Sequence, residues 1–140
     1  MAIKAATPYI FVPGRAPQAI EHYAQALGAE VSAMMRLGDI DPSAPEDKRD
    51  LIMHCELMVG GAKLMLSNGM GDEKTKREDP PVHIALSLDD EADARRKFDA
   101  LAQGGTVTEA LFSSPWGTLF GSLTDRFGIS WLFDVTLDKN

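Results

Sequence analysis

The chain carries the same strand–glycine turn–strand pattern twice, and this repeat limits its fold more than any other feature. The first copy, His54 to Leu66, reads HCELMVGGAKLML. The second copy, Trp116 to Phe133, reads WGTLFGSLTDRFGISWLF and turns at Asp-Arg-Phe-Gly. Met65 and Leu132 each lie four residues after the turn glycine of their copy, so the two copies share a register. A hairpin repeated in this way indicates a duplicated fold.

The composition excludes several classes of protein. A length of 140 residues suits one domain with a real core, so we expect a single domain over residues 1–140. A net charge of -7 argues against nucleic acid or an anionic membrane as partner. No apolar run approaches the ~18 residues of a membrane span, and the first residues lack the core of a secretion signal. Cys55 is the only cysteine, which fits a cytoplasmic location.

The first half of the chain predicts the order β-α-β-β-β. Pro17 suits the first turn of a helix, and Gly28 suits the left-handed position just past its end. Between them, apolar residues recur at helical spacing: Ala19, Ile20, Tyr23, Ala24 and Leu27. Residues 38–50, which hold two prolines and several acids, predict an exposed loop. The strands are expected at residues 5–12, at 30–37 and in a hairpin over 51–67.

The second half predicts the same order again. Residues 82–88 alternate as a strand, and Asp89 or Asp90 can cap a helix with an acidic first turn. Its buried stripe is expected to be Ala94, Phe98, Leu101 and Ala102, and Gly104-Gly105 is expected to end it. A strand near residues 106–110 and the second hairpin follow. The polar residues between the halves predict a linker at about 69–80, with module 1 at about 4–68 and module 2 at about 81–137.

Alternate residues of a strand lie on opposite faces, which gives each sheet an apolar face for its helix and a mixed face. Cys55, Leu57 and Trp131 belong to the apolar faces. The sequence thus predicts an α+β fold of two tandem modules forming a curved mixed sheet, with an open cup on one side and the helices outside. Residues of the mixed faces and a tryptophan near the mouth are expected to line the cup: His54, Glu56, Met65, Ser67, His83, Trp116 and Leu132.

The paired modules resemble the vicinal-oxygen-chelate superfamily, which includes glyoxalase I, bleomycin-resistance proteins and extradiol dioxygenases. PYIFVPGRAPQAIEHYAQALGAEV is similar to the start of the first module of that family, and VHIALSLDDEADARRKFDALAQGGTV to the start of the second. The two hairpin sequences are most similar to the PhnB-like branch. The resemblance spans almost the whole chain.

Metal-dependent members of that superfamily bind one divalent ion through four side chains, from the first strand and the hairpin end of each module. Carried over by position, these sites fall on Pro8, Met65, His83 and Leu132. Only His83 is a strong ligand for a catalytic divalent ion, since a thioether suits such ions poorly and proline and leucine side chains offer no donor. We therefore expect no bound metal and no other cofactor, unless His54 and Glu56 supply ligands from unusual positions.

The candidate catalytic residues are His54, Glu56 and His83, and each also has a structural interpretation. His54 and Glu56 share a strand face, so they can form an acid/base pair or a structural ion pair. His83 can contact a small molecule, or it can be a histidine that is hydrogen-bonded inside the cup. Trp116 can form a wall of the ligand site or pack at an interface.

The resemblance implies two functions. The first is a metal-free protein that binds a small apolar or amphipathic molecule in the cup. The alternative is an enzyme of the lyase, isomerase or dioxygenase type with an atypical metal or acid/base site. The expected partners are a small-molecule ligand and, as in many family members, a second copy of the chain in a homodimer.

Overall fold

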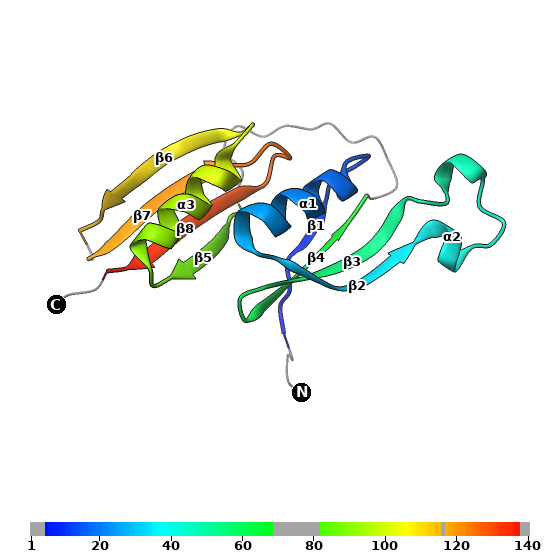
Figure 1. The fold of residues 1–140 in the computed structure, drawn as a ribbon, viewed down its shortest axis with the longest axis horizontal. Helices are drawn as coiled ribbons and strands as arrows, with labels where there is room; N and C mark the ends of the chain where they lie inside the picture. Colours follow the sequence, from blue (N-terminus) through cyan, green and yellow to red (C-terminus); the bar gives the residue numbers. More distant parts are fainter. Residues whose placement is uncertain (1–4, 69–81, 116, 138–140) are drawn as a thin grey trace. The chain divides into compact units, whose positions relative to one another are not determined.

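The computed structural model describes residues 5–68, 82–115 and 117–137 (Figure 1). The chain divides into two compact units, residues 1–74 and residues 75–140. Each unit contains one helix of twelve residues and one four-stranded sheet. No helix in the described part of the chain is long and apolar enough to cross a membrane. The duplicated α+β architecture predicted from the repeated hairpin is confirmed.

The first unit follows the predicted order β-α-β-β-β. Its elements are β1 (Tyr9–Phe11), α1 (Ala16–Leu27), β2 (Glu30–Arg36), α2 (Leu37–Ile40), the 3₁₀ turn η1 (Glu46–Lys48), β3 (Ile52–Val59) and β4 (Ala62–Ser67). The strand order in this first sheet is β1-β4-β3-β2. β1 runs parallel to β4, and the other neighbours are antiparallel. The predicted loop at residues 38–50 holds two short helical turns instead. Arg49, just after η1, donates to the carbonyls of Pro42 at 2.8 Å and of Gly38 in α2 at 3.4 Å.

Helix α1 begins with a proline in its first turn and ends at Gly28, whose φ of 73° is left-handed as predicted. The predicted apolar stripe is partly wrong: Ala24 is exposed and Ile20 only half-buried. The buried apolar residues of the helix are Ala16, Ala19, Tyr23, Ala26 and Leu27. Ala24 directly follows the fully buried Tyr23, and a step of one residue turns a side chain by about 100° out of the stripe. The helix packs against β3.

The second unit repeats this order. Its elements are β5 (Ile84–Leu88), α3 (Glu91–Ala102), β6 (Thr106–Ser113), β7 (Thr118–Thr124) and β8 (Ser130–Thr136). The second sheet has the order β5-β8-β7-β6, with β5 parallel to β8. Asp90 caps α3 as predicted, its side chain accepting a hydrogen bond from the Asp93 amide at 3.0 Å. The predicted strand at 106–110 extends three residues further, to Ser113.

The sorting of the hairpin residues onto two faces agrees with the burial of most of them, whereas Ser67 and Ser130, expected on the open faces, are buried. In the first sheet, Cys55, Leu57 and Leu66 have no measurable exposure. In the second sheet, Trp131 and Phe133 are equally buried, and the Phe133 ring meets Phe98 of α3 edge-on at 5.0 Å. Residues between these positions, such as His54 and Leu132, are only partly buried. Each sheet thus has a helix-covered face and an opposite face, which we call the open face.

Candidate functional site

The register of the first sheet brings three predicted positions into contact range on its open face. Met65 of β4 pairs with Glu56 of β3 on one side and with Tyr9 of β1 on the other. Ala33 of β2 continues the row beside Glu56. His54 lies on the same face, two residues before Glu56. Strand pairing therefore assembles the site, because β1 and β2 lie far from the β3–β4 hairpin in the sequence.

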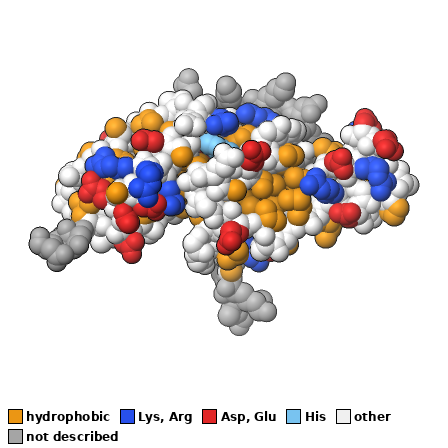
Figure 2. All heavy atoms as spheres, viewed as in Figure 1, with side chains coloured by type: hydrophobic (Ala, Val, Ile, Leu, Met, Phe, Trp, Pro, Cys, Tyr) orange, Lys and Arg blue, Asp and Glu red, His pale blue; other side chains and the backbone are white. Residues whose placement is uncertain are grey.

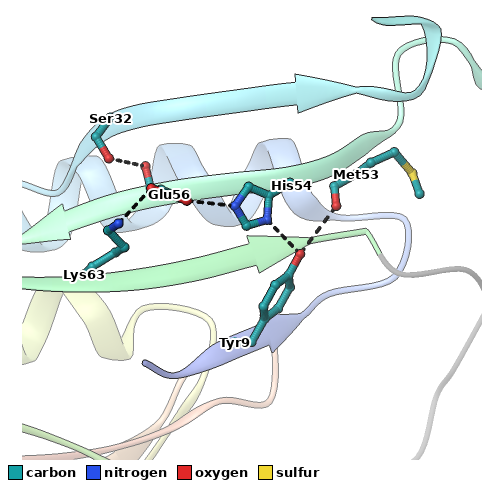
Figure 3. Close-up of polar contacts among 6 residues, drawn as sticks. All are labelled: Tyr9, Ser32, Met53, His54, Glu56 and Lys63. Carbon is teal, nitrogen blue, oxygen red and sulfur yellow. Dashed lines mark hydrogen bonds and ion pairs between the residues drawn. The ribbon is translucent and has the colours of Figure 1, made fainter. Parts of the chain in front are cut away.

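A chain of hydrogen bonds links four side chains across this face (Figure 3). The Tyr9 hydroxyl lies 3.0 Å from His54 Nδ1, and His54 Nε2 lies 3.0 Å from Glu56 Oε2. Lys63 Nζ lies 3.0 Å from the other carboxylate oxygen, Glu56 Oε1. Figure 3 shows Tyr9 pointing from β1 toward His54 on β3, with α1 behind the sheet. We call Tyr9, His54, Glu56 and Lys63 the polar chain.

The charge of Glu56 decides the direction of the hydrogen bonds in the polar chain. The hydrogen bond from His54, followed by the contact with Lys63, holds the pKa of the Glu56 carboxyl below its ordinary value. An ionised carboxylate only accepts, so His54 Nε2 carries the proton toward it. In the neutral imidazole Nδ1 then has a lone pair and accepts the Tyr9 O–H. While the imidazole is neutral, the order of donation runs from Tyr9 to His54 to Glu56. The predicted pairing of His54 with Glu56 is present.

An aromatic edge borders the polar chain on β1. The rings of Tyr9 and Phe11 stack with their centroids 4.9 Å apart and their planes at 19°. Phe11 is 59% exposed, which is unusual for a large apolar ring. Met65, which lies beside Tyr9 on the same face, is half-buried. The open face of the first unit therefore combines a stacked aromatic pair with a hydrogen-bonded polar row.

The open face of the second sheet is lined by hydroxyl groups and aromatic rings. Leu132 lies beside Ala85 of β5. Asp134 accepts a hydrogen bond from the Thr118 hydroxyl at 2.6 Å, and Thr108 and Ser122 are joined by a hydroxyl contact of 2.6 Å. Phe112 and Phe120 meet edge-on with centroids 6.3 Å apart. This face carries less charge than the open face of the first sheet.

The structure places the predicted cup residues as follows. His54, Glu56, Met65 and Ser67 lie on the first sheet, Ser67 with only 3% exposure. Leu132 lies on the second sheet, and the exposed His83 lies just before β5. Trp116 falls outside the described residues. Sequence reasoning missed Tyr9, Phe11 and Lys63 as site residues, and the pairing of the first strand with the hairpin is the signal that would have found Tyr9.

The side chains around Met65 on the open face do not suit the divalent metal ion that metal-dependent members of the superfamily bind. Pro8, carried over as a ligand position, lies just before β1, and its carbonyl accepts the Met65 amide at 2.9 Å. The side chain beside Met65 on the open face is that of Tyr9, and neither a thioether nor a neutral phenol is a good ligand for such an ion. Both ring nitrogens of His54 are already engaged. Within the described ranges, no three His, Cys, Asp or Glu residues gather as a metal site.

Comparison with protein families finds a match along most of the chain. Residues 7–133 match the family model of the glyoxalase/bleomycin resistance protein/dioxygenase superfamily. Protein YjdN of Escherichia coli K12 is 28% identical over 139 residues, which covers 92% of this chain and 93% of that protein.

Solved structures show the same fold. Protein PA1353 from Pseudomonas aeruginosa superposes with a TM-score of 0.80 at 35% identity, covering 97% of this chain and 100% of that one. A PhnB protein from Bacillus cereus, described as a putative 3-demethylubiquinone-9 3-methyltransferase, superposes with a TM-score of 0.75 at 23% identity. That comparison covers 95% of this chain and 100% of the PhnB protein.

Proposed function

Because this chain belongs to the glyoxalase/bleomycin resistance protein/dioxygenase superfamily, we propose that it binds a small molecule on the open face of its first sheet without a metal ion. It is a PhnB- and YjdN-like member of that superfamily. The observation that carries the proposal is the pair Tyr9 and Met65, which lie side by side where a metal-dependent site needs strong donors. Together with the exposed ring of Phe11, they favour an apolar or amphipathic ligand.

We expect no stoichiometric binding of Ni²⁺, Zn²⁺ or Mn²⁺ at micromolar concentration, measured by isothermal titration calorimetry on the folded, chelator-treated protein. The reason is that His54 and Glu56 already satisfy each other and that Met65 is a poor ligand for these ions. The His83→Ala variant is the control, because an exposed histidine can bind Ni²⁺ weakly outside any built site. One ion bound per chain with micromolar affinity in that variant would contradict the proposal.

A second candidate is an enzyme that uses acid/base chemistry, and one observation favours it. His54 lies 3.0 Å from an ionised Glu56 and 3.0 Å from a hydroxyl, so the imidazole is oriented on both sides. The His54→Ala variant separates the two candidates once a ligand has been identified by mass spectrometry of the purified protein. Conversion of that ligand by the wild type and not by the variant favours the enzyme; binding without conversion favours the binding protein.

The methyltransferase description of the Bacillus PhnB protein is not part of this proposal. Methyl-donor folds of the Rossmann type bind their nucleotide at a glycine-rich loop that joins a strand and a helix of a doubly wound parallel sheet. Both sheets of this chain are mixed, and the strands within each are mostly antiparallel.

We also propose that the chain forms a homodimer in the cytoplasm. The edge strand β2 exposes three large apolar side chains, those of Val31, Met34 and Met35. Figure 2 shows hydrophobic side chains gathered on the surface over β2 and β3. An exposed apolar edge strand in a free monomer invites aggregation, so a partner that covers it is favoured. Light scattering is expected to give twice the monomer mass of 15.2 kDa, and a clean monomer would contradict the proposal.

A further inference from the structure

The Tyr9 hydroxyl is the polar group through which the open face can recognise a ligand. Its proton already takes part in a hydrogen bond within the protein. Among the described residues it has two partners, His54 Nδ1 at 3.0 Å and the Met53 carbonyl at 3.4 Å. Hydrogen bonds between a hydroxyl and an oxygen are usually 2.5–3.0 Å long, roughly, so the contact with Met53 is the weaker of the two. With a neutral imidazole, both partners are acceptors. The O–H therefore points into the polar chain rather than toward a ligand.

Because the Tyr9 proton is used within the protein, the phenol oxygen can offer a ligand only its lone pairs. A phenol oxygen carries one proton and keeps acceptor capacity after donating it. A ligand that meets this oxygen must therefore donate a hydrogen bond. A carboxylate or phosphate would place its own lone pairs against those of the phenol, and the ionised Glu56 lies in the same row of the sheet. Lys63, the cation of the polar chain, is held at 3.0 Å by Glu56.

The apolar part of the site favours a flat ligand. The Tyr9 and Phe11 rings are nearly parallel at 19°, and Phe11 is 59% exposed on the same strand face. Since the two rings stack on each other, a flat ligand would add a further ring against the exposed side of Phe11, in an offset arrangement. A ring stacked on this edge can carry a substituent toward the Tyr9 oxygen.

We infer that the ligand of the open face is a planar aromatic molecule with a neutral hydroxyl or amine that donates to the Tyr9 oxygen. His54 and Glu56 are positioning residues in this arrangement, because they fix the phenol as an acceptor. The inference rests on the proposed small-molecule function and narrows it to one chemical class, excluding anionic ligands at this point of the site.

Three naphthalene probes with the same ring system test the inference at about pH 8, where an ordinary imidazole is neutral. They are 2-naphthol, which donates, 2-methoxynaphthalene, which cannot, and 2-naphthoate, which is an anion. We expect 2-naphthol to bind about 3- to 10-fold more tightly than the methyl ether, as one neutral hydrogen bond allows. In Tyr9→Phe the two affinities should become equal. Thr108→Val, which removes a hydroxyl from the second sheet, should change neither.

A second measurement needs no ligand. Nitrogen-15 shifts of the His54 ring, assigned with a His54→Gln variant, should show Nδ1 without a proton at the same pH. A protonated Nδ1 overturns the inference, and so does equal binding of naphthol and its ether, or tightest binding of naphthoate. In these cases the proposed function survives if the ether still binds. If no probe binds, the proposed function is contradicted and the inference falls with it.

Discussion

Replacing Asp125 by alanine is expected to lower the free energy of unfolding by about 4 kcal/mol, because one buried and two partly buried donors lose their acceptor. Asp125 is 3% exposed and begins the turn between β7 and β8. Its Oδ1 accepts from the amides of Phe127 at 2.9 Å and Ile129 at 3.0 Å, and its Oδ2 accepts from Trp131 Nε1 at 2.9 Å. One carboxylate thus holds both the turn and the largest fully buried side chain among the described residues.

Thermal unfolding followed by circular dichroism measures this effect, with a fall in the midpoint of roughly 10 °C expected for a protein of this size. The matched control is Asp99→Ala, which removes a carboxylate from an exposed position of α3 and should stay within about 0.5 kcal/mol of the wild type. An Asp125→Ala protein as stable as that control would show that the turn does not depend on its carboxylate.

The sequence predicted the elements well where local signals were strong. Gly28 and Asp90 marked helix ends correctly, and the turn at residues 125–128 was read from its glycine, whose φ is 85°. Strand ends were less well predicted. β1 spans only Tyr9–Phe11, whereas a strand was expected over 5–12, because pairing with β4 and not β-propensity sets where a strand stops.

The candidate site was predicted only in part, since most of it depends on contacts between strands. The pairing of His54 with Glu56 followed from alternation within one strand. The contact of Tyr9 with His54 joins residues 45 positions apart, and no local pattern encodes it. The register also decides which residue of the first strand lies on the open face. It places Tyr9 beside Met65, where the comparison by sequence position had placed Pro8.

Gly105 shows a constraint that is neither a local sequence signal nor a strand register: two backbone segments approach each other closely. It follows α3 in the second unit, and its amide donates to the Ala102 carbonyl at 2.8 Å. A Cβ atom at this position would overlap the Thr124 carbonyl oxygen and lie 2.8 Å from the Asp125 Cα and carbonyl carbon. These are backbone atoms of the turn that Asp125 organises, so they cannot rotate away as a side chain would. Glycine is therefore required here by space and not by its φ angle.

We expect Gly105→Ala to destabilise the protein by about 3 kcal/mol or more, because overpacking against fixed backbone is among the costlier single changes. Gly61→Ala is the matched control: its new Cβ meets nothing within 4 Å. That variant should be neutral, or more stable by up to about 1 kcal/mol through the lower entropy of the unfolded chain. Urea unfolding of both variants measures the difference. If Gly105→Ala were as stable as Gly61→Ala, residue 105 would not pack closely against the backbone of the β7–β8 turn. The segment that follows α3 would then not be held against the second hairpin at this point.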